Sequence, residues 1–576
     1  MKLVDSISNG SHGDYPQMAA ATSRRMTLSC RLLVAAMACI LGLAVTRCAG
    51  QELPATYPVR GVVQNSITHQ PIARALVGDD ASGGSVLTDG EGRFELDLPE
   101  GPVAITVRRP GYRQGMESRH AVKVGADIAA LSFYLTPVAS IAGHVTLSGG
   151  DEPGGLSFFI YRKRDVEGHL RWMQEGMATT DSGGDIRFPE LDAPANYVLC
   201  NDPSSNDTRA VTYGYPSICF PGGADFASAA SAPLTLSPGQ QAELEIALAR
   251  QRFYRVSITT TNLHRGQGAS IEIHSQGGPQ SATAMQRSLQ PGDVEAELPN
   301  GNYYAEAHLW GRPSSYGRVD FKVSDGPVTG LTLNPLPLQP LMVEVRKDFT
   351  ASNSNGNEPH IGIASGSMNV DNPGVNLSLI PADNLSGNPI GGNLHRPEGS
   401  ANSDLYEMDE ITPGRYWVRA DSYQAYVSSI SSGDTDLARE PLTIGPGSSS
   451  APIEITLRND MGDIQGTVNS EANAGAATGA GSGEVKLVFV YAIPQFAYTG
   501  RIAQMPTGPI GNFELPNLAP GTYSVIAFDR NIEINMDDAD GLARISAQGQ
   551  TVTVEAGGTA QVQLNSIHSG EESASQ

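Results

Sequence analysis

The sequence predicts an all-β fold of about five β-sandwich domains connected in series. Short segments in which apolar and polar residues alternate recur along the chain, which is typical of strands with one buried face. Turn-forming residues separate these segments. The chain has 64 Gly and 38 Pro, and their combined share stays below the roughly 25–30 % that is typical of low-complexity chains. One hairpin pattern recurs five times, and 576 residues suffice for several domains of about 100–200 residues each.

The repeated hairpin has a simple physical explanation. An alternating strand leads into a turn rich in Pro, Asn and Gly, and a second strand then begins with Tyr or Val on the buried face. The fullest copy is GNFELPNLAPGTYSV at residues 511–525. The other four copies occupy residues 92–107, 184–199, 294–303 and 405–418.

These copies predict the following domain organisation. An N-terminal extension and signal peptide (1–50) precede sandwiches at 51–138, 139–250, 251–338, 339–458 and 459–566, and a disordered tail follows at 567–576.

The N-terminus carries the features of a secretory signal. Residues 32–45 form an uncharged apolar run, shorter than the about 20 residues of a membrane-spanning helix and within the about 7–15 of a signal core. Arginines precede it, and small residues before Gln51 suit cleavage. We therefore expect an exported protein, periplasmic, outer-membrane-associated or extracellular, whose mature chain has no transmembrane segment. Translation from Met26 instead of Met1 stays open, and Arg47 disfavours lipidation of Cys48.

The five cysteines leave one intramolecular pair. Cys30, Cys39 and Cys48 lie in or beside the signal segment, so Cys200 and Cys219 remain in the mature chain. An oxidising compartment favours a disulfide between them, with two buried free thiols as the alternative. Two cysteines without neighbouring histidines fall short of the four ligands of a structural zinc site.

Composition and motifs exclude several functions. The formal charge of −23 disfavours a nucleic-acid binder, because phosphate neutralisation requires clustered Lys and Arg. The sequence contains no His-Glu-x-x-His, Gly-x-Ser-x-Gly or P-loop motif. The acidic segment at 535–541 lacks the ligand spacing of a helix–loop–helix calcium site, so a solvated, negatively charged loop is expected, with an irregular calcium site as the alternative. The sequence therefore predicts a protein without catalytic residues, metal site or cofactor, with a hydrolase as the least favoured alternative.

The first predicted sandwich resembles a known family. Gly61-Val62, PIARALV at 71–77, TDGEGRF at 88–94 and Pro110-Gly111-Tyr112 resemble the carboxypeptidase regulatory-like domain over residues 57–137. The resemblance implies an immunoglobulin- or transthyretin-like, carbohydrate-binding-like sandwich found in secreted bacterial proteins. The second and fifth units match more loosely, and the third and fourth only through the hairpin.

Three residues of this unit are predicted to form a structural turn. The residues are Thr88, Asp89 and Gly92. The Asp89 side chain can accept hydrogen bonds from backbone N–H groups of the turn, and Gly92 can adopt a positive φ without a Cβ clash. A ligand-binding role for the same residues is the alternative.

The resemblance makes polysaccharide the first candidate ligand. Exposed aromatic rings stack on sugar faces, and Trp310 and Trp417 are the candidates, although most such side chains pack or protect strand edges. The predicted function is therefore a non-catalytic scaffold or binding role at the cell envelope. An adhesive or protein-interaction module that binds envelope proteins is the alternative.

Overall fold

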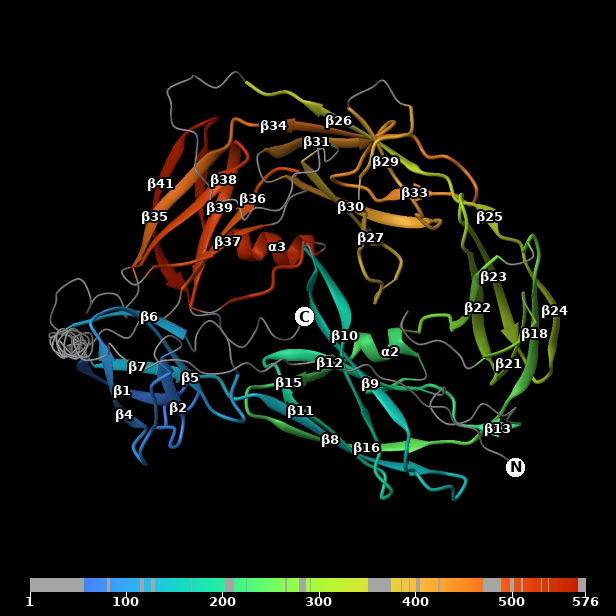
Figure 1. Cartoon of the computed structure of the whole chain (residues 1–576), viewed down its shortest axis with the longest axis horizontal. Helices are drawn as coiled ribbons and strands as arrows, with labels where there is room; N and C mark the ends of the chain where they lie inside the picture. The colour runs from blue at the N-terminus through green and yellow to red at the C-terminus, as the bar shows by residue number, and fades with distance from the viewer. Residues whose placement is uncertain are drawn as a thin grey trace, which may run out of the picture. The chain divides into compact units, whose positions relative to one another are not determined.

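The structure is a computed structural model that describes residues 56–567 with internal gaps (Figure 1). The predicted signal segment at 1–50 and residues 568–576 of the predicted tail lie outside the described residues. The gaps within 56–567 are 80–82, 114–118, 126–129, 167, 203–211, 224, 265–266, 279–285, 291, 351–373, 385, 393, 400–403, 423–424, 470–487, 498–501, 509–510, 530 and 537.

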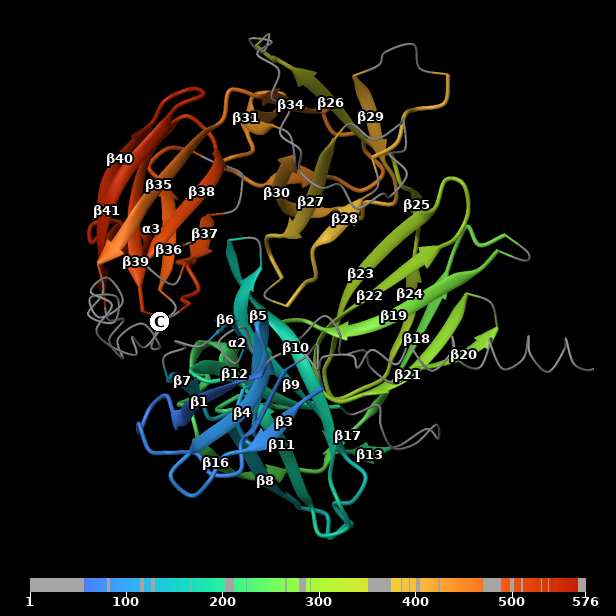
Figure 2. The same cartoon turned by 60° about the vertical axis from the view of Figure 1, so that its left-hand side comes forward.

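The described strands form five β-sandwiches in chain order, coloured from blue to red in Figures 1 and 2. The first has sheets β4-β1-β7 and β3-β2-β5-β6. Its strands are β1 (Thr56–Asn65), β2 (Leu76–Asp79), β3 (Ser85–Leu87), β4 (Arg93–Pro99), β5 (Gly101–Arg108), β6 (Arg119–Val124) and β7 (Leu131–Leu135).

The second sandwich has sheets β11-β8-β16 and β10-β9-β12-β14, with β15 beside β12. Its elements are β8 (Ala139–Leu147), β9 (Ser157–Val166), β10 (His169–Thr179), β11 (Asp185–Leu191), β12 (Ala195–Asp202), β13 (Tyr213–Gly214), β14 (Cys219–Phe220), α2 (Phe226–Ser231), β15 (Leu234–Leu236), β16 (Gln241–Leu248) and β17 (Gln251–Arg252). β17 pairs with β13 of this unit, although the predicted boundary assigns it to the next.

The third sandwich has sheets β20-β21-β18-β24 and β19-β22-β23-β25. Its strands are β18 (Tyr254–Thr260), β19 (Ala269–Ser275), β20 (Gln286–Gln290), β21 (Asp293–Leu298), β22 (Gly301–Leu309), β23 (Ser315–Val323), β24 (Val328–Leu333) and β25 (Leu336–Pro337).

The fourth sandwich has sheets β29-β26-β34-β31-β32 and β28-β27-β30-β33. Its strands are β26 (Leu341–Lys347), β27 (Val375–Pro381), β28 (Ile390–Gly392), β29 (Leu405–Met408), β30 (Gly414–Ser422), β31 (Tyr426–Ser432), β32 (Thr435–Asp436), β33 (Leu442–Ile444) and β34 (Ile453–Arg458).

In the fifth sandwich a short parallel pairing of β39 with β41 joins the two sheets. Its elements are β35 (Gly462–Asn469), β36 (Phe489–Pro494), β37 (Ala503–Pro506), β38 (Asn512–Leu518), β39 (Gly521–Phe528), α3 (Ala539–Ser546), β40 (Gln550–Val554) and β41 (Thr559–Ile567). β41 ends one residue inside the predicted tail, and the short helix α3 begins within the acidic segment at 535–541.

All five sandwiches share one strand pairing. In each, the first strand pairs in parallel with a strand near the end of the unit, as in β1 with β7, β8 with β16 and β18 with β24. The same holds for β26 with β34 and β35 with β41. The two ends of each unit therefore lie side by side in one sheet. The predicted all-β, multi-domain sandwich fold is confirmed.

Each sandwich has a core of its own. Five clusters of buried side chains, one for each sandwich, share no residue with one another. They arise from alternation along the strands: in β22, Tyr303, Ala305 and Ala307 are buried in the core, while Tyr304, Glu306 and His308 point to the opposite face. Alternation thus provides both a core and a second, chemically different face.

A buried tyrosine fixes the repeated hairpin. Its hydroxyl donates to a carbonyl of the preceding turn: Tyr303 to Pro299 at 3.0 Å, Tyr416 to Thr412 at 2.8 Å and Tyr523 to Ala519 at 2.7 Å. Each of these carbonyls lies four residues before its tyrosine, and in the second sandwich Tyr197 donates to the carbonyl of Asp192 at 2.7 Å. The polar tip of the ring thereby satisfies a turn carbonyl while the ring fills the core.

Candidate functional site

A concentration of polar and aromatic side chains lies on the third sandwich. It occupies the face of β19, β22 and β23 that is directed away from the core. The strand register places Glu272 opposite Glu306 and His274 opposite Tyr304. On the other side of β22, Tyr316 lies opposite His308, and Arg318 opposite Glu306. We call this set the third-sandwich face; its residues are Ser270, Glu272, His274, Tyr304, Glu306, His308, Tyr316, Arg318 and Asp320.

Trp310 lies directly after the end of β22, next to this face. Its side chain is exposed, with a relative accessibility of 61 %. The Trp310 backbone N–H donates to the carbonyl of Gly268 at 3.0 Å, and the Gln267 side chain donates to the carbonyl of Trp310 at 3.2 Å. The indole lies across Gly268, where a Cβ would meet the ring at 2.3 Å. Because Gly268 has no side chain, the Trp310 indole has room to lie across it.

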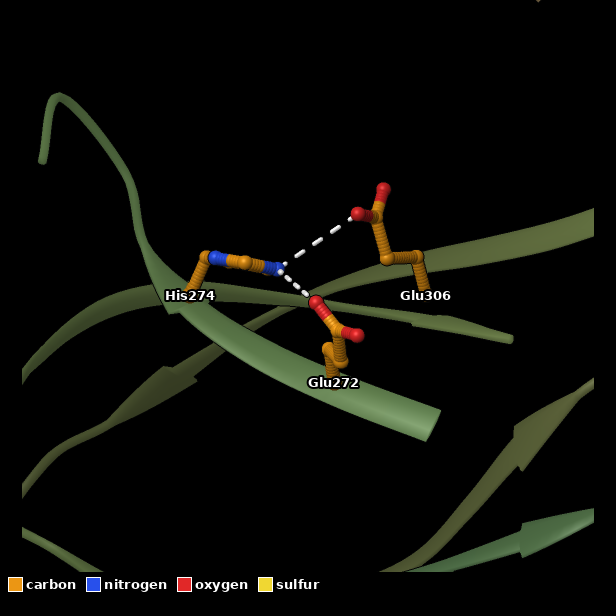
Figure 3. A group of neighbouring side chains, drawn as sticks. All are labelled: Glu272, His274 and Glu306. Atoms are coloured by element: carbon orange, nitrogen blue, oxygen red, sulfur yellow. Dashed lines mark ion pairs between the residues drawn. The ribbon is translucent and has the colours of Figure 1, made fainter. Parts of the chain in front are cut away.

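Glu272, His274 and Glu306 converge on one point (Figure 3). The Nε2 atom of His274 lies 3.5 Å from Oε2 of Glu272 and 3.4 Å from Oε1 of Glu306. The His274 side chain is 3 % exposed, that of Glu306 16 % and that of Glu272 43 %. Neither ring nitrogen of His274 makes a hydrogen bond to the described residues. The three groups have the composition of a cation-binding cluster.

Hydroxyl groups hold both carboxylates in place. Ser270 Oγ donates to Oε1 of Glu272 at 3.0 Å, and the Tyr316 hydroxyl donates to Oε2 of Glu306 at 2.9 Å. In each carboxylate the second oxygen is the one that faces His274. The arrangement therefore orients one oxygen of each glutamate toward the imidazole.

Aromatic stacking encloses the cluster. The His274 ring stacks on Tyr304, with centroids 5.0 Å apart and planes at 20°, and the Arg318 guanidinium lies over the Tyr304 ring at 3.9 Å. His308 meets Tyr316 edge-on at 4.9 Å. These contacts bury the imidazole and fix its plane.

The environment shifts the pKa values of the surrounding groups. Burial acts to raise the pKa of Glu306, but the interaction with the nearby His274 and the hydrogen bond from Tyr316 outweigh it and the net shift is downward, which favours the carboxylate. Burial, with a smaller contribution from Glu306, raises the pKa of Tyr304 to about 12. Burial also raises the pKa of Tyr316, so its hydroxyl stays protonated as the donor to Glu306.

A second cluster of the same composition lies in the fourth sandwich. His395 Nε2 is 3.2 Å from Oε1 of Glu407 and 3.4 Å from Oδ2 of Asp409. The His395 and Asp409 side chains are 44 % and 60 % exposed. Water solvates these groups and already stabilises their charges, so a bound ion would stabilise this cluster less than the buried one.

An open depression with a volume of about 970 Å³ lies on the fifth sandwich. Its rim includes Gln465, Glu514 and Gln561, whose side chains bond one another at 3.2 Å. Neither Tyr nor Trp is among its lining residues, and the side chains of Gln465, Glu514 and Gln561 are already paired with one another. It therefore offers a weaker sugar-stacking surface than the region around Trp310.

The predicted turn residues of the first sandwich hydrogen-bond to the backbone. Thr88 Oγ1 donates to the carbonyl of Ile72 at 2.6 Å and accepts from the N–H of Ala75 at 2.9 Å. Asp89 Oδ1 accepts from the N–H groups of Glu91 and Arg93 at 3.0 and 2.7 Å. Gly92 has a φ of +72°, and a Cβ there would meet the Val63 carbonyl oxygen at 2.5 Å. These contacts describe a structural turn.

Cys200 and Cys219 lie directly opposite each other on β12 and β14 and form a disulfide. Both are buried in a small cluster with Trp172 and Phe226, outside the main core of the second sandwich. The disulfide thus ties the short strand β14 to the sheet.

Trp417 differs from Trp310 in its surroundings. It alternates on β30 with buried Tyr416 and Val418, so it points away from the core of its sandwich. Its ring is half-buried and stacks on His169 with centroids 5.4 Å apart. A sugar would have to displace this contact in order to stack on the same ring face.

Sequence reasoning missed the cluster around His274. The available signal was the pattern Glu272-x-His274 together with Tyr304-x-Glu306-x-His308, because alternate residues share a strand face. Only the pairing of β19 with β22 shows that the two patterns meet.

Comparison with known proteins identifies one stretch by family. Residues 58–136 match the carboxypeptidase regulatory-like domain, which confirms the resemblance predicted for the first sandwich. No curated protein matches the chain. Within the described residues, no helix has the length and apolar character needed to cross a membrane.

Several solved structures align with parts of the chain at low similarity. The Bacillus anthracis TIE protein is 11 % identical, with 74 % of this chain and 78 % of that chain covered and a TM-score of 0.16. The Streptococcal ancillary pilin is 13 % identical, with 49 % and 100 % covered and a TM-score of 0.18. The shaft pilin spaA from Lactobacillus rhamnosus GG is 12 % identical, with 35 % and 98 % covered and a TM-score of 0.13.

Proposed function

We propose that this protein is an exported, non-catalytic binding protein of the cell envelope, and that it binds polysaccharide at Trp310 on the third sandwich. The exposed indole of Trp310 is the observation that carries the proposal. Leaving so large an apolar ring in water forgoes about 1.5–3 kcal/mol of burial free energy, so an exposed ring in a held position is suited to a ligand. The flat faces of sugar rings stack on such a ring.

The surroundings of Trp310 support a binding platform. The backbone of Trp310 donates a hydrogen bond to Gly268 and accepts one from the Gln267 side chain, and the absent side chain at Gly268 leaves space for the indole. Farther along the same strand face, the exposed Arg318 and the partly exposed Glu272 supply charged groups for sugar hydroxyls. A fixed ring loses little conformational freedom on binding, which favours affinity.

The geometry of the carboxylates favours binding over hydrolysis. Two carboxylates that cleave a glycosidic bond flank the sugar, so the space between them must admit substrate. Here one oxygen of Glu272 and one of Glu306 both face Nε2 of His274 and lie within 4.8 Å of each other, and the imidazole is only 3 % exposed (Figure 3). The pair is therefore engaged with a protein side chain.

Binding to a polysaccharide panel by affinity electrophoresis tests the proposal. Trp310→Ala should weaken binding about tenfold or more, the equivalent of at least about 1.4 kcal/mol. Trp417→Ala is the matched control: it removes the same side chain from a half-buried position on another sandwich, and binding should persist. Equal binding by the wild type and Trp310→Ala would contradict the proposal.

A second variant leaves the tryptophan in place. Gly268→Ala introduces a Cβ within 2.3 Å of the indole and should displace the ring, so binding falls although Trp310 is present. If the wild type binds no polysaccharide, a pull-down from envelope extract tests the protein-interaction alternative with the same variants.

A further inference from the structure

We propose that Glu272, His274 and Glu306 bind a first-row divalent cation of the Zn²⁺ class. The ligand atoms are Oε2 of Glu272, Nε2 of His274 and Oε1 of Glu306. The proposal rests on the spacing of these atoms, their orientation and their charge, and it does not depend on polysaccharide binding.

The two distances from His274 to the carboxylate oxygens fit tetrahedral coordination. Bonds of about 2.0–2.1 Å at tetrahedral angles separate two ligand atoms by about 3.3–3.4 Å. In the structure Nε2 of His274 lies 3.5 Å from the Glu272 oxygen and 3.4 Å from the Glu306 oxygen. These distances are long for hydrogen bonds but suit atoms that share a metal ion.

The neighbouring hydroxyls orient the ligands as an outer shell does. Ser270 and Tyr316 each bind the carboxylate oxygen that faces away from His274 and leave the facing oxygen available. Hydrogen bonds of this kind hold metal-binding carboxylates in position, and their removal typically weakens metal binding about 10–100-fold.

Burial and charge both favour the binding of a divalent cation at this cluster. The imidazole is 3 % exposed, and neither of its nitrogens makes a hydrogen bond to the described residues, which is a costly state for a polar ring. A neutral imidazole with two carboxylates carries a charge of −2, which one divalent cation neutralises. Glu272, at 43 % exposure, leaves a route for the ion from solvent.

The ligand set selects the kind of ion. Nitrogen together with carboxylate oxygen suits Zn²⁺ and neighbouring transition metals, whereas Ca²⁺ takes about 6–8 oxygen ligands at longer distances. Three protein ligands leave the fourth position to water. In the alternative arrangement a protonated imidazole bridges the two carboxylates and no ion binds.

Competition with a chromogenic zinc chelator on the purified full chain tests the site. The wild type should bind one more equivalent of Zn²⁺ than His274→Gln or Glu272→Gln. The Glu272 side chain is partly exposed, so its replacement tests the site even if the His274 variant fails to fold. His395→Gln removes the exposed cluster of the fourth sandwich and should leave this equivalent unchanged.

Two further measurements identify the geometry. Co²⁺ bound at the site should give the intense visible absorption of four-coordinate cobalt, and His274→Gln should abolish it. Tyr316→Phe should weaken Zn²⁺ binding about 10–100-fold, because it frees the Glu306 carboxylate. Trp310→Ala should bind Zn²⁺ like the wild type, which separates this proposal from polysaccharide binding.

The proposal is wrong if Zn²⁺ binds equally well to the wild type and to Glu272→Gln. It is also wrong if His395→Gln alone removes the bound equivalent, or if Ca²⁺ and Mg²⁺ at the same concentration displace the zinc.

Discussion

At the scale of single residues, the turn at Thr88–Gly92 shows how closely the backbone specifies a side chain. Gly92 combines a φ of +72° with a carbonyl oxygen at 2.5 Å from where a Cβ would stand. Gly90 lies in the same turn, but a Cβ there would meet nothing within 4 Å. These two glycines are only two positions apart, but only Gly90 has room for a side chain.

Gly92→Ala should destabilise the first sandwich by about 1–3 kcal/mol, because alanine would have to adopt a left-handed conformation and its Cβ would also clash with the backbone. Gly90→Ala is the matched control and should change stability by less than about 0.5 kcal/mol. Hydrogen exchange of peptides from β1 and β4, followed by mass spectrometry, measures both effects. Equal exchange in the two variants would contradict this assignment.

The tyrosine of the hairpin is a second residue-scale test. Tyr303→Phe leaves the carbonyl of Pro299 without its donor inside the core and should cost about 1–2 kcal/mol. Tyr213→Phe, at a side chain that is 51 % exposed, should be nearly neutral. Exchange rates in β21 and β22 measure the difference, and a neutral Tyr303→Phe would show that the hydrogen bond contributes nothing.

Glu306 makes the stability of the third sandwich depend on pH. Its pKa in the folded state lies below the ordinary value of 4.5, because the nearby His274 and the hydrogen bond from Tyr316 outweigh the effect of burial. Such a group contributes stability that is complete above its unfolded-state pKa and is lost as pH falls through the folded-state value. Below pH 4.5 the wild type should therefore lose more stability than Glu306→Gln. Urea midpoints of the two proteins across this pH range measure the difference, and parallel curves would contradict it.

At the scale of elements, the disulfide stabilises a strand that is too short to be stable through its own backbone pairing. β14 contains only Cys219 and Phe220, and Cys219 pairs with Cys200 of β12. A loop of 19 residues closed by a disulfide gains roughly 3 kcal/mol relative to the reduced chain.

Reduction should therefore lower the unfolding temperature of the second sandwich, and the Cys200→Ala/Cys219→Ala variant should show the same loss without any response to reductant. Scanning calorimetry with and without reductant measures both. Alkylation of both cysteines in unreduced, denatured protein would show instead that the thiols are free.

The repeated hairpin is the element that the sequence predicts best. Its two strands adjoin in the chain, so alternation, turn residues and the buried tyrosine all act locally. The parallel pairing of the first strand with a strand near the end of each unit was not predicted. That pairing joins segments far apart in the chain, and no local preference selects a partner at such a distance.

At the scale of the whole molecule, the separate cores imply that each sandwich responds to mutation by itself. Ile464 is fully buried in the core of the fifth sandwich, which shares no residue with the core of the first. Sites without shared partners usually contribute additively.

Ile464→Ala should cost the fifth sandwich about 2–5 kcal/mol and leave hydrogen exchange in the first unchanged. Thr467→Ala, at an exposed position on the same strand, is the control and should alter neither. A change in the exchange of β1 in the Ile464 variant would show that the sandwiches are coupled.

The candidate site shows where sequence reasoning stops. Trp310 and Trp417 were equivalent candidates on aromatic character alone, and their different exposure depends on which groups cover each ring. The cluster around His274 depends on the register of β19 against β22, and a slip by one residue would place Glu306 on the core face.

The order of residues alone determines the all-β class, the recurring hairpin, the family of the first sandwich and the pairing of Cys200 with Cys219. Each of these depends on neighbouring residues or on simple counting. Tertiary structure alone decides which strands pair in parallel, which indole stays exposed and that Glu272, His274 and Glu306 meet. These features join residues from separate strands, and the burial of a common core sets the register that brings them together.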